Sequence, residues 1–309
     1  MSFWNILQTK INQTSLFKEE VPSKKEKPHL LTKDKLDTEE NINIEEIYQE
    51  LNSLVGLKML KNLVREIEAF VMINKKRQKE NLTIEPLVFH MIFRGNPGTG
   101  KTTVARILGK LFKGLGVLKS GHVVEVERAD LVGEFVGQTA QKVKTKIHES
   151  LGGILFIDEA YSLARGGEKD FGKEAIDTLV KAMEDYKNEF ILILAGYKIE
   201  MDFFLMSNPG LRSRFPVHIN FEDYSIDELM SIAEIMALKR QYEITLEGKK
   251  VLYKLLVQRR LDYDHDKFGN AREVRNIIEK TIRKQALRLS KKTNIDRKDL
   301  IYLRKEDFM

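Results

Sequence analysis

The sequence predicts an α/β protein in which helices flank a parallel sheet of about five strands and a small helical domain follows. Nearly continuous apolar runs recur between residues 87 and 221, and such runs are typical of strands buried on both faces of a parallel sheet. From about Tyr224 onward the apolar residues recur at helical spacing. The expected strands are Leu87–Phe93, His122–Val126, Ile154–Ile157, Phe190–Ala195 and Val217–Phe221.

A glycine-rich loop follows the first expected strand. Its residues Gly95-Asn96-Pro97-Gly98-Thr99-Gly100-Lys101-Thr102 match the full phosphate-loop pattern, and a helical pattern comes directly after them. Inward backbone N–H groups and the positive end of a helix dipole bind anions in such a loop. We therefore expect the loop and Thr103 to bind ATP, with the Lys101 amine on the β- and γ-phosphates and the Thr102 hydroxyl on Mg²⁺.

Two acids, Asp158 and Glu159, end the third expected strand. This is the Walker B pattern, in which Asp158 would complete the Mg²⁺ shell and Glu159 would polarise the attacking water. Acids also end ordinary strands, but the phosphate loop upstream favours the catalytic interpretation. A further strand and helix separate this strand from the phosphate-loop helix, and that order is typical of additional-strand ATPases rather than of simple kinases.

The chain divides into three parts by composition. Residues 1–45 combine a short amphipathic stretch containing Trp4 with a polar run of mixed charge, which predicts a flexible tail. That tail could dock a partner or a membrane surface, or fold back on the body. Residues 46–222 form the expected α/β domain, and residues 223–309 form the expected helical domain.

Composition excludes several other classes of protein. The 309 residues contain no cysteine, so disulfides and thiolate metal sites are excluded, and the six histidines lack metal-ligand spacing. Lys and Arg number 52 against 46 Asp and Glu, a mixed balance that favours a solvated surface over a nucleic-acid partner. No apolar run spans a membrane and no signal-peptide pattern is present, so we expect a cytoplasmic location.

Further short motifs surround these features. Together the segments that stand out are Leu54-Val55-Gly56-Leu57, Gly95 to Thr102, Phe135-Val136-Gly137, Leu155 to Tyr161, Leu194-Ala195-Gly196-Tyr197, Asn208 to Phe215 and Gly269-Asn270-Ala271-Arg272. With these segments the chain resembles AAA+ ATPases of the CbbX/CfxQ branch. The resemblance covers roughly residues 50 to 290. The Asp-Glu-Ala-Tyr and Ala-Gly-Tyr pieces suggest this branch in particular.

The resemblance implies roles around the nucleotide. Val55 and Gly56 would border the adenine base. Arg272 would be sensor 2, a lid residue that contacts the γ-phosphate of the same subunit, on a helix whose N-cap we expect to be Asn270. The polar residue that usually ends the fourth strand, sensor 1, is not obvious, and Tyr197 is the candidate for it. A surface arginine is the alternative for Arg272.

The resemblance also implies a contribution from a neighbouring subunit. Arg214 would be an arginine finger, catalytic together with Lys101 and Glu159, and Arg212 is the second candidate. Pairing with acids at a subunit surface is the alternative role for these arginines. A finger supplied in trans requires a closed head-to-tail ring of identical subunits, and the family implies six of them.

A pore loop completes the set of expected sites. Phe135-Val136-Gly137 matches the aromatic–hydrophobic–glycine loop of protein-threading rings, where an exposed aromatic grips an extended chain; packing of Phe135 into the core is the alternative. We expect an ATP-driven ring that remodels or threads a protein client. Among the members that the resemblance suggests, the Lys-, Ile- and Asn-rich composition and the short chain favour those of sporulation over those that reactivate rubisco. Two other hypotheses remain, a nucleic-acid motor, for which no binding motif is appended, and a scaffold in which ATP only orders the ring.

Overall fold

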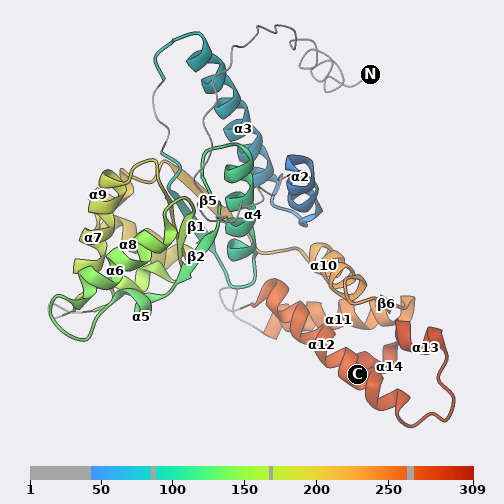
Figure 1. Ribbon diagram of the computed structural model, residues 1–309. Coiled ribbons are helices and arrows are strands. Elements are labelled where there is room, and N and C mark those ends of the chain that lie inside the picture. The colour runs from blue at the N-terminus through green and yellow to red at the C-terminus, as the bar shows by residue number, and fades with distance from the viewer. Residues whose placement is uncertain (1–42, 85–87, 167–169, 263–267) are drawn as a thin grey trace, which may run out of the picture. The chain divides into compact units, whose positions relative to one another are not determined.

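The computed structural model describes residues 43–84, 88–166, 170–262 and 268–309 (Figure 1). Apart from residues 43–45, the expected N-terminal tail with Trp4 lies outside the described residues. Ile42–Met309 form one compact unit. In the described part of the chain, no helix is long and apolar enough to cross a membrane.

The sheet confirms the predicted fold class. Its five strands run parallel in the order β2-β3-β4-β1-β5. The first strand begins at Met91, later than expected, and Leu87 lies outside the described residues. Because the strands are parallel, the carboxyl ends of β1, β3 and β4 lie at one edge of the sheet. The strands are β1 (Met91–Gly95), β2 (Val123–Val126), β3 (Ile154–Ile157), β4 (Ile191–Gly196) and β5 (Val217–Phe221).

Helices cover both faces of this sheet, which explains the continuous apolar strands. In β1, the fully buried Met91 and Phe93 pack with α2, α3 and α4, whereas Ile92 packs with the helices of the opposite face. Burying each such side chain contributes about 1.5–3 kcal/mol. The first face carries α2 (Ile44–Ser53), α3 (Lys58–Lys79) and α4 (Lys101–Gly114). The second carries α5 (Arg128–Leu131), α6 (Gln138–Ser150), η1 (Ala160–Ala164), α7 (Gly172–Asp185), α8 (Lys198–Ser207) and α9 (Pro209–Arg212).

The C-terminal elements surround a separate core that includes Leu229, Leu252, Val274 and Phe308. A capping box, in which Ser225 and Glu228 bond each other's backbone N–H, starts the first helix. The structure adds a pair of two-residue parallel strands that the helical pattern does not predict. The elements are α10 (Ile226–Leu238), β6 (Glu243–Ile244), α11 (Leu246–Asp262), α12 (Asn270–Leu289), α13 (Arg297–Ile301), β7 (Tyr302–Leu303) and α14 (Lys305–Phe308).

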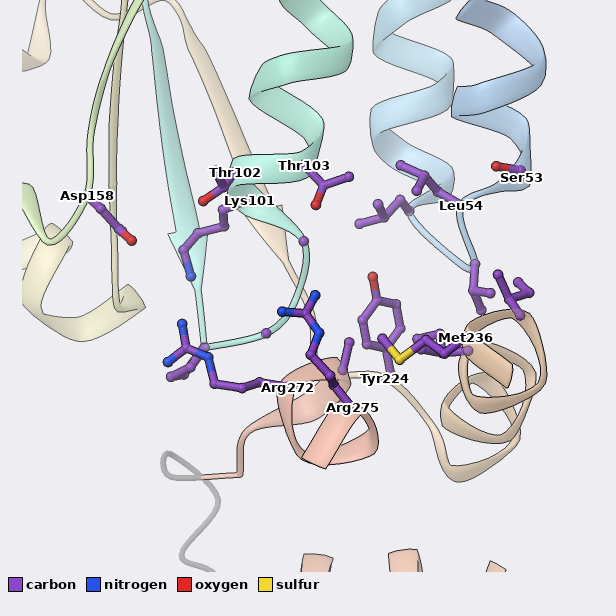
Figure 2. A pocket seen from close by; sticks show the side chains of 18 of the residues that line it. Ser53, Leu54, Lys101, Thr102, Thr103, Asp158, Tyr224, Met236, Arg272 and Arg275 are labelled. Atoms are coloured by element: carbon purple, nitrogen blue, oxygen red, sulfur yellow. The ribbon is translucent and has the colours of Figure 1, made fainter. Parts of the chain in front are cut away.

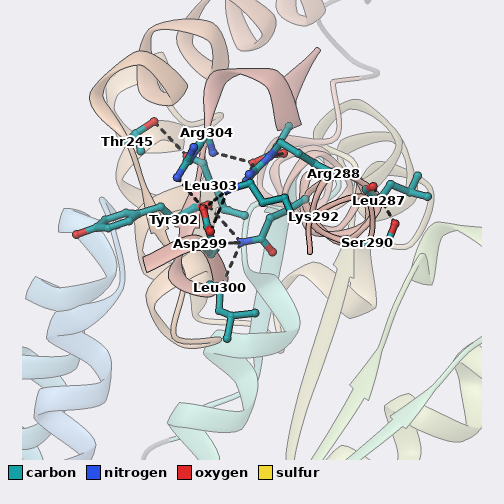
Figure 3. A network of polar contacts seen from close by, with 12 residues as sticks. Thr245, Leu287, Arg288, Ser290, Lys292, Asp299, Leu300, Tyr302, Leu303 and Arg304 are labelled. Atoms are coloured by element: carbon teal, nitrogen blue, oxygen red, sulfur yellow. Dashed lines mark hydrogen bonds and ion pairs between the residues drawn. The ribbon is translucent and has the colours of Figure 1, made fainter. Parts of the chain in front are cut away.

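Two buried carboxylates hold the C-terminal segment together, and one of them ties it to α12 (Figure 3). Asp299 accepts from the Lys292 amine at 3.0 Å and from the Arg304 guanidinium at 2.8 Å. Asp307 is 1% exposed and pairs with Arg288 Nε at 2.8 Å. Since an unpaired buried charge is costly, Arg288 stabilises α14 against α12, and Lys292 and Arg304 stabilise α13 within the C-terminal segment.

Candidate active site

A cavity of about 370 Å³ lies among the phosphate loop, the end of β3, the turn before α3, and helices α10 and α12 (Figure 2). That volume is typical of small-molecule sites. Most of the residues expected to contact nucleotide line it. They are Val55, Pro97, Gly98, Gly100, Lys101, Thr102, Thr103, Asp158, Glu159, Tyr197 and Arg272.

The remaining expected contacts, Gly56, Gly95, Asn96 and Thr99, do not line the cavity but shape its walls. Thr99 is buried, and its hydroxyl donates to the Asn96 carbonyl oxygen at 2.8 Å. The Asn96 amide in turn donates to the Asp223 carboxylate at 3.1 Å. Gly56 has a φ of +68° and faces Glu228 so closely that a Cβ would meet its Oε1 at 2.7 Å. These residues hold the backbone of the loop and of the turn before α3.

The phosphate loop has a conformation that requires glycine. Gly98 and Gly100 have φ values of +71° and +100°, in the region that favours glycine. A Cβ on Gly98 would also lie 2.1 Å from the Gly269 carbonyl oxygen, because the loop packs directly on the start of α12. Lys101 opens α4, and its Nζ donates to the carbonyl oxygens of Gly95 at 2.7 Å and Asn96 at 2.9 Å.

Burial dominates the electrostatics of Lys101. Desolvation lowers the pKa of its amine, the nearby Arg272 lowers it further, and Asp158 and Glu159 oppose the shift. A partly desolvated ammonium interacts more strongly with a phosphate than one in bulk water, because the local dielectric is lower. The cavity therefore combines cations and backbone N–H groups suited to a polyphosphate.

The two acids leave β3 through a strained residue. Glu159 has a φ of +46°, a left-handed conformation that costs a non-glycine residue of the order of 1 kcal/mol. Its backbone N–H donates to Asp158 Oδ1 at 3.0 Å. Strain of this kind clusters at functional sites. Both acids line the cavity on the side of Lys101.

Tyr197, the sensor 1 candidate, follows β4 and lines the same cavity. Its ring lies 5.9 Å from that of Tyr161, centroid to centroid. Burial, and secondly the charge of Glu159, raise the pKa of the Tyr197 hydroxyl. The group therefore stays a neutral hydrogen-bond donor beside the acids.

Contacts between the loop and the helical domain run through Tyr224, which no sequence motif marks, and through Ala271. The Tyr224 hydroxyl donates to the Thr99 carbonyl oxygen at 3.0 Å, and the Ala271 N–H donates to the Gly98 carbonyl oxygen at 3.1 Å. Tyr224, like Lys239 and Arg275, also lines the cavity.

Asn270 does not have the capping role predicted for it. Helix α12 begins at Asn270, but the N-cap is Gly269 and no side chain caps the helix. Instead Asn270 is fully buried with a φ of +46°, and its amide donates to Asp223 Oδ1 at 2.7 Å while its Oδ1 accepts from the Tyr224 N–H at 3.0 Å. The Asn270 side chain thus joins the end of the α/β domain to α12.

Arg214 lies away from this cavity. Its guanidinium pairs with Glu184 and donates from Nη1 to the Gly210 carbonyl oxygen at 2.6 Å. A second cavity, of about 610 Å³, is lined by Arg214 together with His90 and Glu184. Arg212 is exposed. Neither arginine lines the nucleotide cavity of its own chain, so a role in hydrolysis for either requires a second subunit.

The expected pore loop is also separate from the cavity and is exposed. Phe135 and Val136 are 66% and 86% exposed, so the alternative in which Phe135 packs into the core is wrong. Gly137 has a φ of +83° and is the N-cap of α6. The loop therefore presents two apolar side chains to solvent at the start of a helix.

This site defines the protein as a P-loop nucleoside triphosphatase, because it combines a parallel sheet, a phosphate loop, an acid pair and a helical lid. Residues 91–223 match the family described as ATPase family associated with various cellular activities (AAA), and residues 225–309 match the AAA lid domain. The chain belongs to the AAA family and, as predicted, is an ATP-hydrolysing enzyme. Members of this family generally form oligomeric rings and act on protein clients.

Named relatives confirm the predicted CbbX/CfxQ branch. The chain is 54% identical over 264 residues to stage V sporulation protein K of Bacillus subtilis, an alignment that covers 85% of this chain and 82% of the relative. It is 42% identical over 270 residues to a chloroplastic ribulose bisphosphate carboxylase/oxygenase activase of Cyanidioschyzon merolae, covering 86% and 91%. It is 43% identical over 252 residues to protein CbbX of Cereibacter sphaeroides, covering 81% of each.

Proposed function

We propose that the protein is a ring-forming ATPase that uses hydrolysis to move Phe135 against an extended protein client. The observation that carries the proposal is the exposed Phe135-Val136 pair on a loop with a fixed base. The Gly133 N–H donates to the buried Thr139 hydroxyl at 2.9 Å, and the Lys142 amine donates to the Val132 carbonyl oxygen at 3.0 Å. A fixed base with an apolar tip suits a group that grips a chain without reading its sequence.

A contact between side chain and backbone links this loop to the acids. Arg128, in the short helix α5 before the loop, donates from Nη1 to the Ser162 carbonyl oxygen at 2.6 Å. Its Nη2 pairs with Asp170 at 2.6 Å. Ser162 belongs to η1, which begins directly after Glu159. A shift of Glu159 on hydrolysis would thus be transmitted through η1 and Arg128 to the base of the loop.

We assign the chemistry to the residues of the main cavity. Lys101 would neutralise the β- and γ-phosphates, Glu159 would accept the proton of the attacking water, and Arg272 would contact the γ-phosphate from the lid. A hydroxyl and a carboxylate, those of Thr102 and Asp158, line the cavity together and fit a hard cation. Bound there, Mg²⁺ would neutralise charge on the phosphate oxygens.

Arg214 would act on the nucleotide of the adjacent subunit. Its position outside the cavity of its own chain supports this role, as does its exposed carboxylate partner, Glu184, which assembly could displace. The ring that this requires is head-to-tail and closed, with six subunits as the expected number.

The place of the activity is inferred from the relatives. Identity of 54% to the protein named for sporulation, against 42% to the named activase, supports a role in sporulation. The activase supports the alternative, a chaperone that acts on rubisco. We propose a protein client in both cases. Nothing in the described part of the chain favours nucleic acid as the partner. The cytoplasmic location stays a prediction.

The proposal is tested by trapping the client in a ring that cannot hydrolyse ATP, an experiment called the client trap below. Glu159→Gln should bind ATP without hydrolysing it, so the stalled ring retains the polypeptide that it grips. Adding Phe135→Ala to this variant should abolish retention while the ring mass, measured by light scattering with ATP and Mg²⁺, stays unchanged. Equal retention by the two variants, or a monomer under these conditions, would contradict the proposal.

A further inference from the structure

Two arginines of α12, Arg272 and Arg275, line the nucleotide cavity, but only the first belongs to a recognisable motif. They are three residues apart and therefore share one face of the helix. In the part of the chain that the structure describes, no ion pair includes Arg275. Its charge is therefore available to a ligand in the cavity.

The two guanidinium groups reach different ends of the cavity. In Figure 2, Arg272 extends toward Lys101 on the side of Asp158, and Arg275 extends toward Thr103 on the side of Tyr224. Electrostatics agree with this view. The charge of Arg272 is one of the causes that lower the pKa of the Lys101 amine, whereas Arg275 is not among the causes of that shift.

The loop fixes which part of a nucleotide lies at each end. In phosphate loops the lysine reaches the β- and γ-phosphates, and the backbone N–H groups cradle the α- and β-phosphates. The γ-phosphate end of the cavity is therefore the end with Lys101 and Asp158. Ser53, Leu54, Val55 and Leu57 also line the cavity. Figure 2 shows Ser53 and Leu54 beyond Thr103 and Tyr224, where the base would lie. Arg275 thus faces the region between the base and the β-phosphate.

We infer that Arg275 binds the α-phosphate, a group that ATP and ADP share, and that it holds the lid on the nucleotide after hydrolysis. Arg272 would contact the γ-phosphate, which only ATP has, whereas Arg275 would bind the α-phosphate of both ATP and ADP. The inference rests on the nucleotide site of the proposed function but is independent of the client and of the pore loop.

Titration calorimetry with ADP and ATP in the Glu159→Gln background tests this division. Arg275→Ala should weaken both nucleotides by a similar factor, about tenfold to a hundredfold, as expected for a charge-assisted hydrogen bond. Arg272→Ala should weaken ATP more than ADP. The matched control is Arg283→Ala, an exposed arginine of the same helix that does not line the cavity, and it should change neither affinity.

Two further measurements distinguish nucleotide binding by Arg275 from a purely structural role. They are the turnover of Arg275→Ala and the recovery of affinity in Arg275→Lys. In the hydrolysing protein, Arg275→Ala should raise KM with little change in kcat, because uniform binding is lost. Arg275→Lys should recover part of the ADP affinity. Unchanged ADP affinity in Arg275→Ala, or a loss confined to ATP, would overturn the inference. Failure of the client trap with these nucleotide affinities intact would overturn the proposed function alone.

Discussion

The two walls of the nucleotide cavity differ in how the chain builds them. The phosphate-loop wall comes from one continuous segment, Gly95 to Thr103, joined by the acids at the end of the neighbouring strand β3. The lid wall is assembled from separate places, including Tyr224, Lys239 and Arg275. We infer that the first wall carries the chemistry, whereas the second sets nucleotide affinity and transmits nucleotide state. Substitutions in the two walls should therefore have different signatures.

Glu159→Gln should give the largest effect and should affect turnover only. Loss of a general base lowers kcat by about 10² to 10⁴-fold, while the amide keeps the shape of the side chain. ATP affinity, measured by calorimetry, should stay close to that of the wild type. Turnover within a factor of a few of the wild type would exclude Glu159 as the base.

Gly98→Ala should affect both walls together. The added methyl group would lie 2.1 Å from the Gly269 carbonyl oxygen, so either the loop or α12 must move. We expect at least a tenfold loss of ADP affinity, about 1.4 kcal/mol. Gly116→Ala is the matched control, because Gly116 has a similar φ of +70° and its Cβ would meet only the end of the Lys75 side chain, at 3.4 Å. An equal effect of the two variants on ADP affinity would show that strain, not the contact with α12, is responsible.

Asn270→Ala should act on stability. It leaves the buried Tyr224 N–H without its acceptor and the Asp223 carboxylate without one donor, at a cost of about 1–3 kcal/mol. Urea unfolding measures this change, with the exposed Asn294→Ala as the control. If Asn270→Ala unfolds like the control, the side-chain link between the domains contributes nothing.

Tyr224→Phe should give the smallest effect. It removes one neutral hydrogen bond, from the hydroxyl to the Thr99 carbonyl oxygen, worth about 0.5–1.5 kcal/mol. Burial raises the pKa of this hydroxyl, so it stays a donor across the neutral range. The loss should appear in the free energy of unfolding, whereas Tyr253→Phe, at an exposed tyrosine, should be neutral. A greater loss in Tyr224→Phe than in Asn270→Ala would reverse the order proposed here.

The same contrast explains what the sequence could predict. A phosphate loop and an acid pair after an apolar strand are local patterns, because each residue depends on its neighbours in the chain. The sheet, the phosphate loop, the acid pair and the Arg272 motif of the lid can therefore be predicted before the structure is known. Arg275 also had a signal, since it lies three residues after Arg272 on one helix face, but the motif ends at Arg272.

Other features depend on distant parts of the chain and carry no local signal. Asn270 looks like a helix cap, yet the partners of its side chain include the distant Asp223, Tyr224 and Pro97 carbonyl oxygen. The two-residue strands β6 and β7 are too short to show an alternating pattern. The start of β1 at Met91 differs from expectation because the apolar run alone does not show where pairing with β4 and β5 begins.

The central claim is that hydrolysis at the first wall drives Phe135 against a polypeptide. The most direct measurement is the amount of an unfolded probe polypeptide translocated per ATP hydrolysed, compared between wild type, Phe135→Tyr and Phe135→Ala. We predict that Phe135→Tyr keeps this ratio and that Phe135→Ala lowers it at least tenfold while ATP turnover largely persists. An unchanged ratio in Phe135→Ala, or parallel loss of turnover and translocation, would contradict the account.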